Sequence, residues 1–425
     1  MATWQAGKLP PALASTGSLH ATAGFWHALG VAGGVVVVVV VTADIVRALV
    51  VPRAGHSRLG RVVETLVDGL FQMISRPISD YERKDRVLAF QAPVSLLVRL
   101  VVWLAGFELG YALLLWPAVA NMPRALEETA SSMFTLGFVY SRGGTPTAVD
   151  VLAAATGLFV VALQIAFLPT LYGAFNRRET EVTLLASRAG TPPWGPELLA
   201  RTRYGGADWT DDLPELYVLW ERWAADVAES HANYPSLVRF RSPQPLSSWV
   251  VALLAVMDSA AMWLAVSPSR ERREARLALR MGFTAMREVG KALGLPMEAF
   301  PDPDPDSDIK LRFEEFESAV EGLVAVGFPV ERSATEAWPH FRGWRVNYET
   351  LAYALAKETD AVPAPWSGPR RWPAKTINVR RPASRLPKET GGFLGHPLQP
   401  PRPASPDAPL PPEKPPDSVA SKSAP

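Results

Sequence analysis

Three long apolar segments near the N-terminus constrain the fold more than any other feature of this 425-residue chain. They cover residues 24–51, 92–120 and 151–175, and the last has no charged residue. A helix needs roughly 20 apolar residues to cross the ~30 Å hydrocarbon layer of a bilayer, and all three segments are long enough. We therefore expect a three-span helical membrane domain over residues 24–180, preceded by an N-terminal arm of residues 1–23.

The first segment has a second interpretation, as the core of a cleaved signal peptide. It contains valine without interruption from Val35 to Val41, and only one basic residue, Lys8, precedes it. Signal cores are shorter than this run and follow a basic stretch. These features favour a membrane span.

Basic residues predict the orientation of the spans. The connection of residues 52–91 is rich in lysine and arginine: Arg53, Arg58, Arg61, Arg76, Arg83, Lys84 and Arg86. The N-terminal arm has only Lys8, and the link between the second and third spans has only Arg124 and Arg142. Because cytoplasmic loops are enriched in Lys and Arg, we expect a multi-pass protein of the cell membrane with a cytoplasmic C-terminus.

Apolar residues recur at helical spacing within this basic connection: Val62, Val63, Leu66, Val67, Leu70, Phe71 and Ile74. Arg58, Arg61, Glu64 and Asp68 occupy the opposite face. Two interpretations stay open. The helix lies in the membrane interface with its apolar side in the acyl boundary, or it packs on the soluble domain.

Three charged residues fall within the predicted spans. Asp44 and Arg99 lie at similar depth in two antiparallel helices, so we expect them to form an ion pair. Glu108 lies deeper, without a partner that the sequence identifies. It either faces a water-filled interior or forms a structural hydrogen bond as a protonated or snorkelling carboxyl group.

The link between the second and third spans, residues 122–142, is too apolar for an ordinary loop and too short to cross a bilayer. Pro123 suits the start of a helix, as do the acidic Glu127 and Glu128. About three turns can follow, to Phe134, before Gly137 breaks the helix.

This arrangement resembles the two-helix pore unit of potassium-channel-like proteins over residues 92–180. Thr135, Gly137 and Phe138 match the filter tract Thr-x-Gly-Tyr/Phe-Gly of that family. The resemblance implies an ion pathway lined by Thr135, Leu136, Gly137, Phe138 and Val139. It also implies a homotetramer, because a filter takes backbone carbonyls from four loops.

The third span would be the inner helix of this unit, with Gly157 and Pro169 as bending points. Val139 replaces the second filter glycine and Tyr140 an acidic residue, so the expected filter is degenerate. The alternative is a re-entrant or surface helix that closes a three-span bundle.

Residues 181–365 show amphipathic stripes at helical spacing and little strand-like alternation, which predicts an all-α cytoplasmic domain. Residues 249–266 are apolar enough to span, but arginines flank them on both sides. A span would place one arginine cluster outside, so a buried core helix is favoured over a fourth span. Glu229, His231 and Asp258 could form an acid–base set; a satisfied helix end and a capped core explain them as well.

The segment 366–425 is proline-rich and lacks apolar periodicity, so we expect disorder. Its basic residues between Arg370 and Lys388 could hold anionic lipid or remain solvated.

Several chemistries are unsupported by the sequence. There are no cysteines, the six histidines are scattered, and the net charge is +1. We find no phosphate loop, dinucleotide fingerprint or serine elbow. We therefore expect no enzyme, cofactor, metal site or nucleic-acid partner. The expected function is passage of potassium or another monovalent cation. The alternative is a non-conducting membrane-anchored sensor or scaffold.

Overall fold

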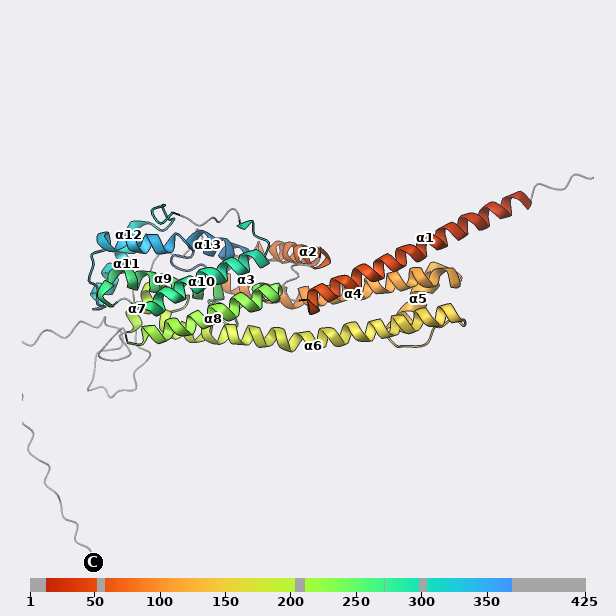
Figure 1. The fold of residues 1–425 in the computed structure, drawn as a ribbon, viewed down its shortest axis with the longest axis horizontal. Helices are drawn as coiled ribbons and strands as arrows, with labels where there is room; N and C mark the ends of the chain where they lie inside the picture. The colour runs from red at the N-terminus through yellow and green to blue at the C-terminus, as the bar shows by residue number, and fades with distance from the viewer. Residues whose placement is uncertain (1–12, 52–57, 203–210, 271, 298–303, 369–425) are drawn as a thin grey trace, which may run out of the picture.

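The computed structural model describes residues 13–51, 58–202, 211–270, 272–297 and 304–368, and all regular elements within these ranges are helical (Figure 1). The N-terminal helices are α1 (Leu13–Ile45), α2 (Arg58–Ser75), α3 (Tyr81–Leu88), α4 (Gln91–Leu115), α5 (Met122–Met133) and α6 (Gly144–Ala189). They are followed by α7 (Gly195–Arg201), α8 (Leu213–Asn233), α9 (Trp249–Val266), α10 (Arg273–Ala292), α11 (Phe313–Ala325), α12 (Ala334–Arg345) and α13 (Glu349–Glu358). A π-helical turn, Val46–Val50, extends α1, and a 3₁₀ turn, Trp116–Ala118, extends α4. The all-α prediction is confirmed.

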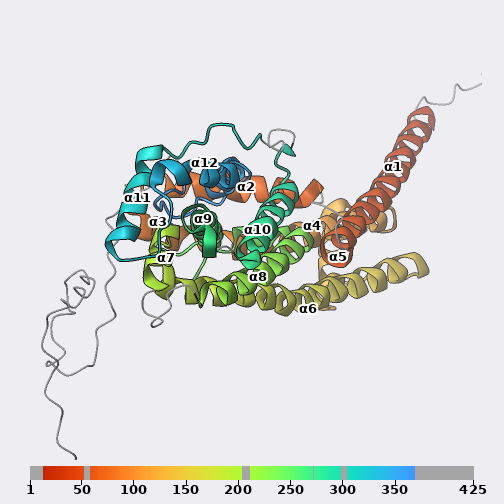
Figure 2. The ribbon, with the colours of Figure 1, turned by 60° about the vertical axis from the view of Figure 1, so that its left-hand side comes forward.

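The helices form two parts along the long axis of the molecule (Figure 1). We call α1, α4, α5 and the first half of α6 the apolar bundle, and α7 to α13 with the end of α6 the helical domain. The 46-residue α6 runs through both without interruption. Figure 2 shows the same two parts after rotation, with α9 enclosed by its neighbours.

Four described helical stretches are long and apolar enough to cross a membrane: Gly24–Val50, Tyr81–Ala118, Gly144–Ala189 and Trp249–Val266. The first three contain the spans that the sequence predicts. They expose large apolar side chains, among them Val36, Leu97 and Phe159. The fourth stretch is α9, and every residue in it is buried within protein. It therefore leaves no face for lipid, as expected of a core helix.

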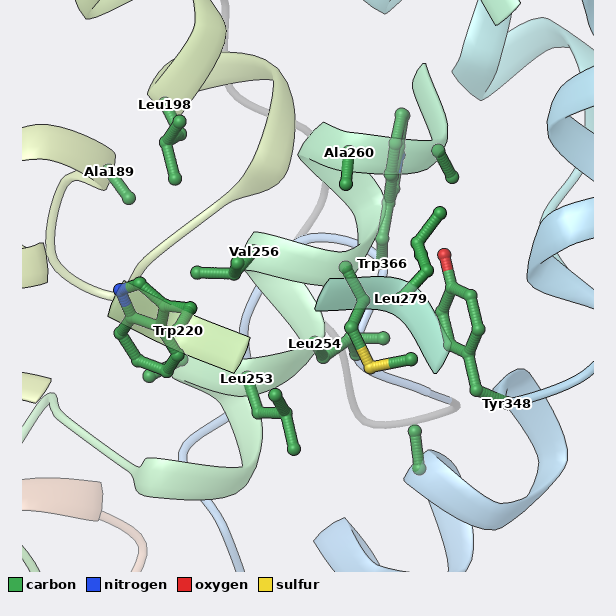
Figure 3. Close-up of a cluster of buried hydrophobic side chains, with 14 of the residues drawn as sticks. Ala189, Leu198, Trp220, Leu253, Leu254, Val256, Ala260, Leu279, Tyr348 and Trp366 are labelled. Atoms are coloured by element: carbon green, nitrogen blue, oxygen red, sulfur yellow. The ribbon is translucent and has the colours of Figure 1, made fainter. Parts of the chain in front are cut away.

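The core of the helical domain is built around α9 (Figure 3). Leu253, Leu254 and Val256 of α9 belong to one cluster with Trp220 and Trp366. Trp366 is completely buried, so the prediction that assigned this residue to a disordered tail is wrong. Residues 369–425, the rest of that tail, lie outside the described residues.

Glycines bring α1 and α4 into close contact. A Cβ atom at Gly34 would lie 2.7 Å from the carbonyl oxygen of Gly110, and one at Gly106 would lie 2.8 Å from Val41. Gly106 and Gly110 are four residues apart, the small-residue spacing that lets membrane helices approach closely. Backbone-to-backbone packing therefore joins the first two predicted spans.

The amphipathic helix α2 packs along α4 with part of its apolar face. Val63, Val67 and Phe71 are buried in a cluster with Leu88. Val62, Leu66, Leu70, Met73 and Ile74 remain exposed. The polar face reaches the helical domain, because Asp68 forms a 2.6 Å ion pair with Arg239. The structure thus gives α4 as the main packing partner of α2 and joins the polar face of α2 to the helical domain.

Candidate pore segment

Helix α5 enters the apolar bundle only partway. Its first turn is capped by Asn121, whose side chain accepts a hydrogen bond from the backbone N–H of Arg124 at 3.0 Å, and Pro123 follows the cap. The helix has 12 residues, about 18 Å at 1.5 Å per residue, so it is too short to cross a bilayer. It packs against both α4 and α6, which confirms the predicted helix and its end near Phe134.

The end of α5 rests against α6 at Gly157. A Cβ atom there would lie 2.3 Å from the carbonyl oxygen of Met133. α6 continues through Gly157 and Pro169, the two predicted bending points. The structure therefore gives Gly157 a packing role at the α5–α6 contact.

Residues 134–143 connect α5 to α6, and we call them the α5–α6 segment. Their backbone turns sharply, because Thr135 and Gly137 have φ angles of 55° and 69°. The carbonyl oxygen of Ser131 accepts hydrogen bonds from the N–H groups of Leu136 and Gly137, at 2.8 and 3.2 Å. A left-handed angle is favourable for glycine but costs about 1 kcal/mol or more at threonine. The turn that follows the end of α5 therefore contains Gly137, the residue at which the sequence predicts a break in the helix.

Two side chains of α5 hold the rest of the α5–α6 segment. The Ser131 hydroxyl accepts a hydrogen bond from the N–H of Val139 at 3.1 Å. Glu128 is completely buried and accepts bonds from the N–H and the hydroxyl of Ser141, both at 2.6 Å. Hydrogen bonds to a carboxylate are about twice as strong as neutral ones. Glu128 is therefore the main anchor of the segment.

A further hydrogen bond joins α5 to α6 beside this anchor. The Ser132 hydroxyl donates to the carboxylate of Asp150 at 2.9 Å. Together with the Gly157 contact, it secures the end of α5, where the α5–α6 segment begins, to α6. The sequence indicates Glu128 only as a residue suited to a helix start, and it gives no signal for Asp150; both are functional candidates in the structure.

Side chains of the α5–α6 segment divide between two directions. Leu136, Phe138 and Tyr140 are 61–65% exposed, whereas Val139 is 6% exposed. Val139 is also absent from the positive-φ residues of the described chain. Valine therefore fits the local backbone, and its side chain packs inward where the resembled family has glycine.

The predicted ion pair between Asp44 and Arg99 is wrong. Arg99 pairs with Glu64 of α2 at 2.5 Å, and Asp44 accepts a hydrogen bond from the Trp103 indole at 2.9 Å. The reason is that α2 lies alongside α4 and brings its own carboxylate to Arg99. Glu108 is half-buried on α4, and within the described residues its side chain has no hydrogen bond or ion pair.

The proposed acid–base set of Glu229, His231 and Asp258 does not assemble. His231 is buried beside Arg178, with 3.0 Å between its Nε2 and a guanidinium nitrogen. Burial and this cation hold the pKa of His231 well below its usual value. Glu229 is exposed. Asp258 belongs to a separate network around Arg345. The three side chains therefore do not share a site.

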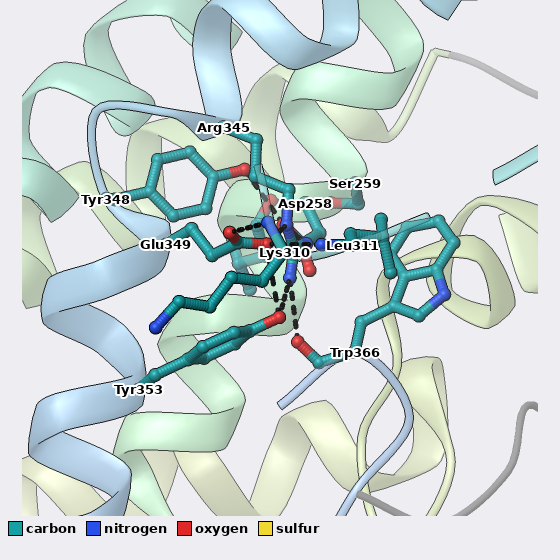
Figure 4. A network of polar contacts seen from close by, with 10 residues as sticks. Asp258, Ser259, Lys310, Leu311, Arg345, Tyr348, Glu349, Tyr353 and Trp366 are labelled. Atoms are coloured by element: carbon teal, nitrogen blue, oxygen red, sulfur yellow. Dashed lines mark hydrogen bonds and ion pairs between the residues drawn. The ribbon is translucent and has the colours of Figure 1, made fainter. Parts of the chain in front are cut away.

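The Asp258 network surrounds a completely buried arginine, Arg345 (Figure 4). Arg345 forms ion pairs with Asp258 and with Glu349, the latter at 3.0 Å. It also donates a hydrogen bond to the carbonyl oxygen of Trp366 at 2.7 Å, and Tyr348 donates to Asp258 at 2.8 Å. One guanidinium thus joins α9, α12, α13 and the chain after α13.

No protein-family model, curated protein or solved structure matches this chain. The resemblance to potassium-channel-like pore units therefore depends on residues 92–180 alone. Within that range, the features available for a function are the short α5, the α5–α6 segment and the long α6.

Proposed function

We propose that this chain is a subunit of a homo-oligomeric, channel-like membrane protein whose α5–α6 segment borders a pathway for potassium or another monovalent cation. The supporting observation is that a helix too short to cross a bilayer is followed by a sharply turned segment, anchored by Glu128 and Ser131. The negative end of the α5 dipole is next to this segment and favours a cation. In the resembled family, backbone carbonyls of such a tract replace the hydration shell of the ion.

In the proposed arrangement α1, α4 and α6 cross the cell membrane. Basic residues in the α1–α4 connection and beyond the third span support a cytoplasmic helical domain and an outer α5–α6 segment. The large exposed apolar side chains of the three helices support contact with lipid or with other subunits. Glycine-mediated packing of α1 on α4 is typical of membrane helices.

The exposed side chains of the α5–α6 segment support assembly around an axis. Phe134, Leu136 and Phe138 are at least half exposed in the single chain. Aromatic and large aliphatic side chains gain stability when a partner covers them. A pathway of the proposed kind requires this segment from several subunits, four in the resembled family.

Rubidium uptake into liposomes tests the proposal. Wild-type protein should take up Rb⁺, and Gly137→Ala should reduce uptake, because alanine disfavours the φ of 69° at this position. Gly69→Ala is the matched control, since nothing lies within 4 Å of a Cβ atom at either glycine. Absence of uptake by a wild-type protein that is monomeric in detergent would refute the channel.

A non-conducting sensor is the second candidate, and the continuity of α6 favours it specifically. The helix runs from the Met133 contact at Gly157 to Val182, Leu185 and Ala189 in the core of the helical domain. Such a rod can carry a displacement of α5 to the domain without conduction. In that case Rb⁺ uptake is absent. A partner that changes the mobility of a spin label on α5 also changes the mobility of a spin label on α13.

A further inference from the structure

A cavity of about 720 Å³ lies where α2 and α3 meet the helical domain. Its wall is formed by the end of α2, by α3, by α13 with the residues that follow it, and by the connections before α9 and α11, which contribute Arg239, Arg241 and Lys310. Small-molecule sites in proteins commonly measure roughly 300–1,000 Å³. The cavity is separate from the α5–α6 segment, and the proposed function does not use it.

Cationic side chains dominate the lining of the cavity. They are Arg76, Lys84, Arg239, Arg241, Lys310 and Lys357. The carboxylates in the lining are Glu358 and Asp360. The cavity therefore has an excess of positive charge before any ligand is considered.

Some of these cations already have carboxylate partners, and two of the pairs join α3 to the helical domain. Lys84 of α3 pairs with Asp360 at 2.5 Å. Arg241 pairs with Asp85 of α3 at 2.5 Å, and Arg239 pairs with Glu358 at 2.8 Å. These ion pairs hold the wall together. They also already engage the carboxylates near the cavity.

Three cations remain without a carboxylate partner in the described part of the chain: Arg76, Lys310 and Lys357. All three are exposed, and each comes from a different element of the wall. The backbone N–H of Lys310 donates to Glu349 at 2.5 Å, which fixes that position. The Lys310 ammonium lies away from the buried network (Figure 4). These charges are thus available to a ligand.

We propose that this cavity binds a phosphate-bearing anion through Arg76, Lys310 and Lys357. Guanidinium and ammonium groups are the protein cations that bind phosphate, through charge-assisted hydrogen bonds. The exposed apolar residue Met73 of α2 follows the lining residue Gln72 in the sequence, so a lipid headgroup can supply the phosphate as well as a soluble anion can. Since the cavity spans this junction, its occupant stabilises α2 and α3 against the helical domain.

The test uses full-length protein in detergent with two probes. Inorganic pyrophosphate is titrated by calorimetry, and bound phosphatidic acid is counted by native mass spectrometry. The variant Lys310→Gln with Lys357→Gln removes two of the available charges. The matched control, Arg188→Gln with Arg222→Gln, removes two exposed charges outside the cavity.

We expect the Lys310/Lys357 variant to bind roughly 25-fold more weakly, at about fivefold per charge, while the control binds like wild type. Binding of pyrophosphate alone identifies a soluble ligand, and binding of phosphatidic acid alone identifies a headgroup; either result supports the site. An unchanged melting temperature without ligand shows that the variant is folded. Failure of both probes to bind, or equal losses in variant and control, overturns the proposal. None of these readouts depends on ion conduction.

Discussion

Gly157 of α6 and Met133 of α5 are in contact so closely that the chain has no space for a side chain at position 157. A Cβ atom added at Gly157 would lie 2.3 Å from the carbonyl oxygen of Met133 and 2.7 Å from the Met133 Cγ atom. Real Cβ atoms do not approach a carbonyl oxygen to that distance. The contact determines where α5 ends and therefore where the α5–α6 segment begins.

Gly157→Ala should displace α5 and lower stability by about 1–3 kcal/mol, the usual penalty for overpacking. The measurement is the melting temperature of the purified protein together with Rb⁺ uptake. Gly173→Ala is the control within the same helix, because only the end of the Arg177 side chain lies near a Cβ atom there, at 3.9 Å. Equal behaviour of the two variants would show that the contact is not needed.

Glu128→Ala should release the α5–α6 segment from α5. The substitution removes the acceptor of two bonds from Ser141, each a charge-assisted bond worth about 1.5–3 kcal/mol. Hydrogen exchange at the Ser141 amide should become faster, with a smaller effect for Glu128→Gln, which retains one acceptor oxygen. Glu127→Ala is the control, since the exposed Glu127 pairs only with the exposed Arg124 in the described structure. Unaltered exchange in Glu128→Ala would contradict the role of this anchor.

Acidification should destabilise the helical domain through His231. Burial and Arg178 lower the pKa of His231, so the folded state binds fewer protons than the unfolded state just below pH ~6.5. Stability from this group is thus complete above pH ~6.5 and is lost as pH falls through the window below it.

His231→Gln should make the melting temperature less dependent on pH across that window, because glutamine can accept from Arg178 and does not titrate. His340→Gln, at an exposed histidine, should leave the pH dependence as in wild type. A His231→Gln protein with the full wild-type pH dependence would contradict this assignment.

Arg345→Met should be strongly destabilising, by about 3–5 kcal/mol, because it leaves the buried Asp258 and Glu349 without their cation. Arg342→Met tests the specificity of the effect. Arg342 pairs with the exposed Asp306 at 3.3 Å, and surface pairs contribute about 0–1 kcal/mol. Thermal unfolding in detergent distinguishes the two variants, and similar losses would contradict the buried network.

Local signals in the sequence made the helices predictable. The three long apolar segments, the short helix ending near Phe134 and the enclosed α9 follow from helix length, Pro and Gly placement and flanking charge. Each of these signals lies within one stretch of sequence. They therefore required no knowledge of which helices are neighbours.

Pairings between helices were not predictable in the same way. The Arg99–Glu64 pair depends on α2 lying along α4, and the charge pattern alone had suggested Asp44. The Glu128–Ser141 bonds form because the chain turns back on α5 at Gly137. Trp366 is next to a proline-rich stretch, yet Arg345 binds its carbonyl oxygen in the core. Such partners become apparent only when the helices are placed together.

The absence of native cysteine permits the most direct test of the pathway. Leu136→Cys places one thiol in the α5–α6 segment, and Leu109→Cys places one on the exposed face of α4. Rb⁺ uptake into liposomes is then measured before and after a charged, membrane-impermeant thiol reagent. The reagent should block uptake through Leu136→Cys and leave Leu109→Cys unaffected. Uptake that the reagent changes in neither variant would contradict a pathway along this segment.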